Sequence, residues 1–150
     1  MGTADLLESE IAGLSTPEEC ARNFPDDPTV ADATALLRRI PPLHFFFDQK
    51  LGRTRPSSAA FEDDEDSDPM SVYRLDVIES EGASVERVMV GHAGFGLASL
   101  TAGQMRSKNQ TVFPDPLPDE SSHAKVCGPK PRHVRRWFAS QAVWVIPPSA

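Results

Sequence analysis

The chain has 150 residues and a net charge of -7, from 22 acidic and 15 basic residues. This balance excludes a uniformly basic nucleic-acid binder, and we do not expect nucleic acid as a partner. Hydrophobic residues make up 39% of the chain, enough for one core. No run reaches the ~18 apolar residues that a membrane span needs. The composition predicts one domain over residues 1–150 that contacts no membrane.

The two cysteines and the chain start suggest a compartment. The first ten residues hold three acids and lack the apolar stretch of a secretory signal, so we expect a cytoplasmic protein. Cys20 and Cys127 lie far apart in sequence, and we expect both to be free thiols in the core. A reactive thiol at Cys127 is an alternative, because Lys125 and Lys130 are close in sequence and positive neighbours lower a thiol pKa.

The N-terminal third is predicted to be helical. Residues 1–27 form a helical extension, in which apolar residues recur at helical spacing over 6–14 and Thr16-Pro17 starts a second short helix. Asp27-Pro28 is then expected to start a third helix, since apolar residues step by three or four up to Ile40. Pro41-Pro42 would end it.

The middle of the chain alternates apolar and polar segments. Residues 43–48 contain three consecutive phenylalanines and are predicted to form a strand buried on both faces, followed by a turn at 49–52. Residues 62–69 begin with six acids in seven positions, which predicts an exposed, mobile loop. Residues 71–78 fit either a helix or a half-buried strand, and residues 84–90 suggest a short strand.

The last third begins with a glycine-containing loop at 91–96 and a helix predicted over 97–105. Strands are expected at 111–113 and 124–127, a helix from Pro131, and an inner strand at 142–146. Because strands and helices intermingle without a strict βαβ rhythm, we expect the α+β class, with a small mixed sheet flanked by helices. We expect one continuous core containing residues 45–47 and both tryptophans.

Charge is unevenly distributed along the sequence. No acidic residue follows Glu120, so the last 30 residues carry +5, and subtracting this from the total of -7 leaves -12 for residues 1–120. This asymmetry predicts a basic face that attracts phosphate, nucleotide or an acidic partner. The alternative is that the acidic loop screens the basic residues within the same molecule.

Two histidines are candidate acid-base groups. His92 lies among glycines in the loop 91–96, which leaves its ring accessible; the alternative is that these glycines serve only a tight turn. His123 follows a proline-rich, acidic segment that could orient its ring; the alternative is that Ser121, Ser122 and His123 only satisfy backbone groups at the edge of the loop. His123, Cys127 and His133 match no familiar zinc spacing, so we predict no metal and no cofactor.

Basic and hydroxyl side chains form the candidate ligand-binding set. Guanidinium groups beside hydroxyls suit a bidentate contact to phosphate or carboxylate. The set comprises Arg53, Arg55, Ser57 and Ser58, together with Arg132 and Arg136 from the basic C-terminal segment.

Three segments carry a resemblance. They are Arg55–Phe61 (RPSSAAF), Met70–Tyr73, and Asp115–Pro118 followed by His123-Ala124. Over roughly Leu36 to Ile146 the chain resembles a group of short, uncharacterised bacterial proteins. The resemblance implies a bacterial origin and a single domain, and it implies no activity.

Two functions are expected from these features. The first is a soluble accessory protein that binds another protein, such as the product of an adjoining gene, through a charge-polarised surface. The alternative is a small enzyme or ligand-binding domain for an anionic, phosphate-bearing molecule or nucleotide, with His92 and His123 as general acid and base. The enzyme is favoured if the two histidines lie in one pocket with Arg53, Arg55 and the two serines. It is disfavoured if these side chains are far apart.

Overall fold

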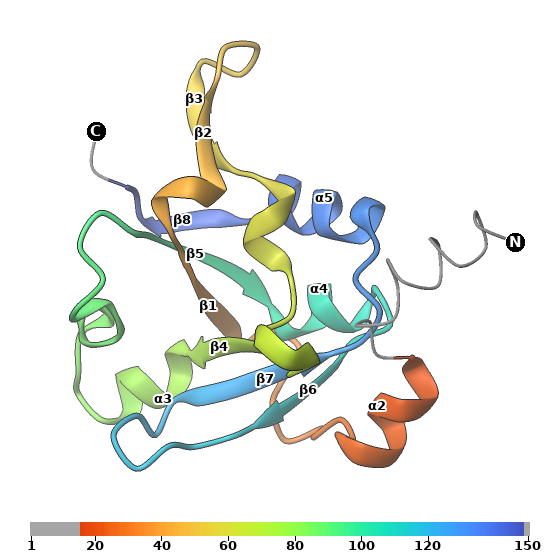
Figure 1. The fold of residues 1–150 in the computed structure, drawn as a ribbon. Helices are drawn as coiled ribbons and strands as arrows, with labels where there is room; N and C mark the ends of the chain where they lie inside the picture. Colours follow the sequence, from red (N-terminus) through yellow and green to blue (C-terminus); the bar gives the residue numbers. More distant parts are fainter. Residues whose placement is uncertain (1–15, 149–150) are drawn as a thin grey trace, which may run out of the picture.

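A six-stranded antiparallel sheet forms the centre of the molecule (Figure 1). The structure is a computed structural model that describes residues 16–148, so the helix expected over residues 6–14 lies outside the described residues. The strand order is β6-β7-β4-β1-β5-β8, and a separate hairpin pairs β2 with β3. The α+β class is confirmed. All strand pairs among the described residues are antiparallel, where a mixed sheet was expected.

The elements have the following bounds. The strands are β1 Ala35–Ile40, β2 Phe45–Asp48, β3 Arg53–Pro56, β4 Met70–Arg74, β5 Gly96–Thr101, β6 Thr111–Pro114, β7 His123–Cys127 and β8 Val143–Ile146. The α-helices are α2 Pro17–Asn23, α3 Leu75–Ser80, α4 Ala102–Arg106 and α5 Arg132–Gln141. Within residues 16–148 there are also four short 3-10 helices: η1 Pro42–His44, η2 Ser58–Phe61, η3 Glu65–Ser67 and η4 Val85–Met89.

The helix predicted from Asp27-Pro28 to Ile40 is wrong, because residues 35–40 form β1, an inner strand of the sheet. Leu36 and Leu37 are fully buried in two different clusters, as expected for neighbours on a strand. Upstream, the carboxylate of Asp27 accepts hydrogen bonds from the backbone N–H and the hydroxyl of Thr29. This local turn replaces the expected helix start.

Two other predicted elements also differ. Residues 96–101 form strand β5, and only then does α4 begin, at a capping box made by Thr101 and Gln104. Residues 85–89 form the 3-10 helix η4 instead of a strand. Residues 71–78 combine both alternatives, since β4 runs directly into α3.

The core lies on both faces of the sheet and forms two clusters, so the expectation of one continuous core is wrong. The larger cluster is covered by α5 and η2, where the rings of Phe61 and Phe138 meet edge to face at 6.1 Å. The smaller cluster gathers Ile78 of α3 and Val88 of η4. Of the three consecutive phenylalanines, Phe45 alone packs against a core cluster.

The hairpin β2–β3 projects from the sheet instead of being buried on both faces (Figure 1). Phe46 and Phe47 expose 41% and 60% of their surface. The turn predicted at 49–52 is confirmed, and Gly52 adopts a positive φ of 67° there, a conformation that favours glycine. The C-terminal strand β8 lies at the edge of the sheet, not inside it.

The short helix α2 is joined to the sheet by a disulfide. Its predicted cap is confirmed, since the Thr16 hydroxyl accepts from the Glu19 N–H at 3.1 Å. Cys20 bonds to Cys127 of β7, with Cα atoms 5.7 Å apart, so the expectation of two free thiols is wrong. The rings of Phe24 and Phe113 stack beside this link. No helix within residues 16–148 is both long and apolar enough to cross a membrane.

Candidate functional site

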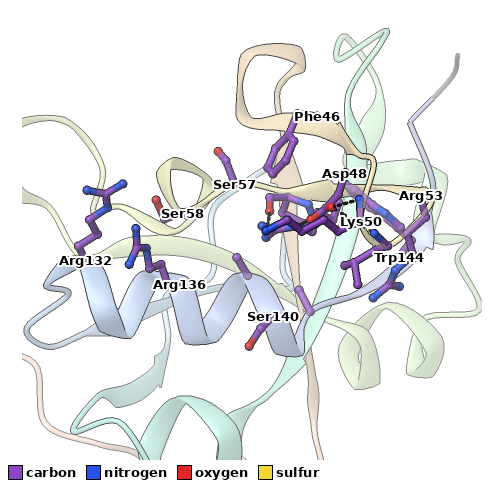
Figure 2. A pocket seen from close by; sticks show the side chains of 15 residues that line it. Phe46, Asp48, Lys50, Arg53, Ser57, Ser58, Arg132, Arg136, Ser140 and Trp144 are labelled. Atoms are coloured by element: carbon purple, nitrogen blue, oxygen red, sulfur yellow. Dashed lines mark hydrogen bonds and ion pairs between the residues drawn. The ribbon is translucent and has the colours of Figure 1, made fainter.

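All six predicted ligand-binding residues line one cleft of about 760 Å³ (Figure 2). The hairpin β2–β3, η2, the exposed side of α5 and the start of β8 form its walls. We call this cleft the basic groove, and its lining residues are Phe46, Asp48, Lys50, Leu51, Arg53, Arg55, Pro56, Ser57, Ser58, Arg132, Arg136, Ala139, Ser140, Ala142 and Trp144. Five of these residues are cationic, and Asp48 alone is acidic.

The α5 wall follows from the amphipathic pattern of that helix. Val134 and Phe138 are buried against the sheet, whereas Arg132 and Arg136 are exposed and lie four residues apart on the groove side. Neither arginine forms an ion pair with a carboxylate of residues 16–148. Their charges therefore remain available to a ligand.

The hairpin wall contains the groove's acid. Arg55 donates through Nε to Asp48 at 2.6 Å, and its guanidinium lies 4.7 Å from the centre of the Phe46 ring. The hydrogen bond from Arg55, aided by the backbone N–H groups of Leu51 and Lys50, lowers the pKa of Asp48. Asp48 is thus charged at neutral pH and neutralises Arg55.

Two further cations of the hairpin are unpaired. The side chains of Lys50 and Arg53 are exposed and form no ion pair within the described part of the chain. With the two arginines of α5, they leave four uncompensated positive charges around the groove.

Trp144 fixes the base of the hairpin on the sheet. Its indole Nε1 donates to the carbonyl of Thr54 at 3.1 Å, and its ring meets Phe45 edge to face. Gly96 allows this position, because a Cβ there would lie 2.5 Å from the Trp144 ring. The groove therefore has a wall attached to the core.

The remaining C-terminal cations are neutralised by the acidic segment 62–69. Lys130 pairs with Asp63 at 2.5 Å, and Lys125 pairs with Asp64 at 3.1 Å. Arg135 pairs with Glu62 at 3.1 Å. Screening of the basic patch within the molecule thus accounts for three of the five cations after Glu120.

The prediction of an exposed acidic loop is correspondingly wrong for Asp63 and Asp64, whereas Glu62 is exposed as expected. The side chains of Asp63 and Asp64 are 7% and 30% exposed. Arg38 anchors this segment by donating to the carbonyls of Ala60, Glu62 and Ser71. Residues 65–68 remain exposed.

The two candidate histidines lie outside the basic groove. His123 is 5% exposed, with Nδ1 2.9 Å from the carbonyl oxygen of Asp115 and its ring against Tyr73. His92 borders a separate cavity of about 280 Å³, where Nδ1 lies 3.3 Å from Arg39. The structure therefore brings the arginines and serines together but does not bring either histidine to them.

Both described cations that line the small cavity beside His92 are held by other groups of the protein. Arg39 donates to the carbonyl of Val88 and to the hydroxyl of Tyr73, and Arg38 is held by backbone carbonyls. Among residues 16–148, no group of three or more histidine, cysteine or acidic side chains is placed to hold a metal ion.

Sequence reasoning missed the other nine residues of the groove, which include Phe46, Asp48, Lys50 and Trp144. Lys50 could have been found, because it lies in the predicted turn between the phenylalanines and Arg53. The aromatic residues could not, since both were assigned to the core. In comparisons with protein-family models, curated proteins and solved structures, the chain matches none.

Proposed function

We propose that the protein binds another protein, and that an acidic segment of this partner occupies the basic groove. The observation that carries this proposal is the convergence of Lys50, Arg53, Arg132 and Arg136, without acidic partners in residues 16–148, around one cleft of a chain with net charge -7. Uncompensated charge on one face steers an oppositely charged partner and fixes its orientation.

The apolar surface of the hairpin supports a protein partner. Two of the exposed large hydrophobic residues, Phe46 and Leu51, line the groove, with exposures of 41% and 55%. Clustered exposed apolar side chains mark interaction sites. Arginine and aromatic residues also dominate binding energy at protein interfaces. The surface therefore suits a segment in which acidic and apolar side chains alternate.

The geometry favours binding over catalysis in the groove. Ser57 donates its hydroxyl to the His44 carbonyl at 3.2 Å, and no histidine lines the cleft to activate either serine. A small anionic ligand is the second candidate, because the predicted phosphate-binding residues do converge there.

A short peptide of alternating Glu and Leu, with fluorescein at its end, tests the proposal by anisotropy. We expect binding that weakens at high salt and is lost for the same peptide with Lys in place of Glu. Arg53→Glu/Arg136→Glu should abolish it. Arg22→Glu, an exposed arginine of α2, is the matched control.

Three outcomes of the peptide assay would contradict the proposal. These are equal binding of acidic and basic peptides, retained binding in the double variant, and equal loss in the Arg22 control. Stronger binding of single-stranded nucleic acid than of the acidic peptide would also overturn it, as would salt-sensitive self-association that occupies the groove with a second copy.

We further propose a revised location for the protein. Disulfides persist mainly in oxidising compartments, so the buried Cys20–Cys127 bond supports such a compartment over the cytoplasm expected from the sequence. Mass spectrometry after rapid thiol alkylation tests this proposal. Two alkylated cysteines in freshly isolated protein would instead support a cytoplasmic location.

A further inference from the structure

We infer that the α5 end of the basic groove is a subsite for a phosphomonoester dianion, formed by Arg132, Arg136 and Ser58. The inference rests on the proposed function, in that a phosphorylated side chain of the partner segment supplies this group. The hairpin end would then contact the acidic and apolar remainder of the segment.

The two arginines are placed for a shared ligand. Arg132 and Arg136 are one helical turn apart and extend on the same side of α5 toward the segment of Ser57 and Ser58 (Figure 2). Their neighbour Arg135 differs, because it donates to the Lys130 carbonyl at 3.0 Å and pairs with Glu62. The fold thus uses Arg135 internally and leaves the other two available.

The hydroxyl groups opposite α5 are held by the backbone. The N–H of Ser57 donates to the His44 carbonyl at 2.8 Å, and the N–H of Ala60 donates to the Ser57 carbonyl at 3.1 Å. Contact between Phe61 and Phe138 joins this segment to α5. Ser57 Oγ already donates to the His44 carbonyl at 3.2 Å, whereas Ser58 Oγ forms no hydrogen bond within residues 16–148 and can donate to a ligand oxygen.

Charge and donor geometry favour phosphate at this end. Two guanidinium groups balance the two negative charges of a phosphomonoester, and each offers paired N–H groups for bidentate contact. The groove's single acid, Asp48, belongs to the hairpin and is held by Arg55. A phosphate at the α5 end therefore lies at the opposite end of the groove from the Asp48 carboxylate, which would repel it.

The test compares three versions of the Glu/Leu peptide, carrying one central phosphoserine, serine or glutamate, with the full-length protein by isothermal titration calorimetry. We expect the phosphorylated peptide to bind at least about tenfold more tightly than the other two. Arg132→Gln/Arg136→Gln should remove this advantage and also weaken binding of the serine peptide, because it takes two of the four uncompensated positive charges from the groove. Arg22→Gln should change neither.

Separate readouts distinguish this inference from the proposed function. Inorganic phosphate should shift the amide NMR signals of Ser57 and Ser58 in the wild type and not in the double variant. Such phosphate-induced shifts support the subsite even if no peptide binds. Failure of every peptide to bind would overturn the proposed function and leave the subsite standing. Equal affinity for the three peptides, or phosphate shifts that persist in the double variant, overturns the subsite. If a nucleoside monophosphate binds more tightly than the phosphopeptide, the claim that a phosphorylated protein partner supplies the phosphate is wrong.

Discussion

The ammonium group of Lys130 lies 2.5 Å from the carboxylate of Asp63, although the Lys130 side chain is fully buried and that of Asp63 is 7% exposed. Lys130 also donates to the carbonyls of Val126 and Gly128. Burial lowers the pKa of Lys130 and raises that of Asp63, while their mutual attraction opposes both shifts. This pair attaches the acidic segment to the turn after β7.

Lys130→Met should destabilise the protein by about 3–5 kcal/mol, because it leaves Asp63 buried without its cation. Replacing both partners, as in Asp63→Leu/Lys130→Met, should cost less than the single change, since no unpaired charge remains. Urea denaturation followed by circular dichroism measures the free energies of unfolding.

Lys50→Met is the matched control for this comparison. Lys50 is exposed and forms no ion pair with described residues, so its replacement should change stability by less than about 0.5 kcal/mol. If the two single variants were equally stable, the buried pair would have no structural role.

The disulfide between Cys20 and Cys127 spans a sequence separation of 107 residues. In the chain-entropy account, a loop of this length stabilises the folded state by about 4.7 kcal/mol. Reduction, or the double change Cys20→Ser/Cys127→Ser, should therefore lower the free energy of unfolding by several kcal/mol. Denaturation with and without dithiothreitol measures the loss, and the reductant should have no effect on the double variant.

The sequence predicts best where local chemistry decides the structure. The Thr16 cap of α2, the Gln49–Gly52 turn, β7 and the start of α5 after Pro131 all follow from residues within a few positions. Thr101 and Gln104 also form a capping-box pattern, which indicates from the sequence that a helix starts after residue 101.

The central strands could not be assigned from spacing alone. Residues 35–40 and 97–101 bury side chains on both faces of the sheet, so their apolar positions fit a helix as well as a strand. Only pairing between β1 and β5, which are distant in sequence, resolves this ambiguity. Phe46 and Phe47 are exposed because β2 pairs with β3 in a hairpin outside the main sheet.

The sequence predicts several residues that line the groove but not the arrangement of the elements that form it. Cations beside serines correctly indicate which side chains gather, whereas the accessibility of His92 and the orienting segment before His123 are local features that do not place either ring in the groove. The separation of His92 and His123 from Arg53 depends on strand order, which the sequence pattern does not specify.

Leu36→Ala tests the assignment of residues 35–40 to an inner strand. Leu36 is fully buried in the larger core cluster, so its truncation should cost about 2–5 kcal/mol. Leu43→Ala is the matched control, because Leu43 is 93% exposed and its truncation should cost less than about 0.5 kcal/mol. Equal losses in thermal or urea unfolding would place Leu36 outside the core.

Asp64 should make stability depend on pH in the acidic range. Burial alone would raise the pKa of this carboxyl, but the hydrogen bond from Ser71 and the charges of Arg38 and Lys125 outweigh burial and lower it below 3.8. Because the folded-state pKa is the lower one, the stabilisation is fully present above about pH 3.8 and is lost as the pH falls through the folded-state value.

Asp64→Asn should therefore destabilise the protein at pH 6. The destabilisation should be much smaller at pH values below the ordinary pKa of aspartate, about 3.9. Urea denaturation of wild type and variant across this range gives the difference in free energy of unfolding. Asp66→Asn is the control, since Asp66 belongs to the exposed part of the same segment and forms no ion pair within residues 16–148. A difference between wild type and Asp64→Asn that stays constant on acidification would show that the Asp64 charge does not hold the acidic segment against Lys125 and Arg38.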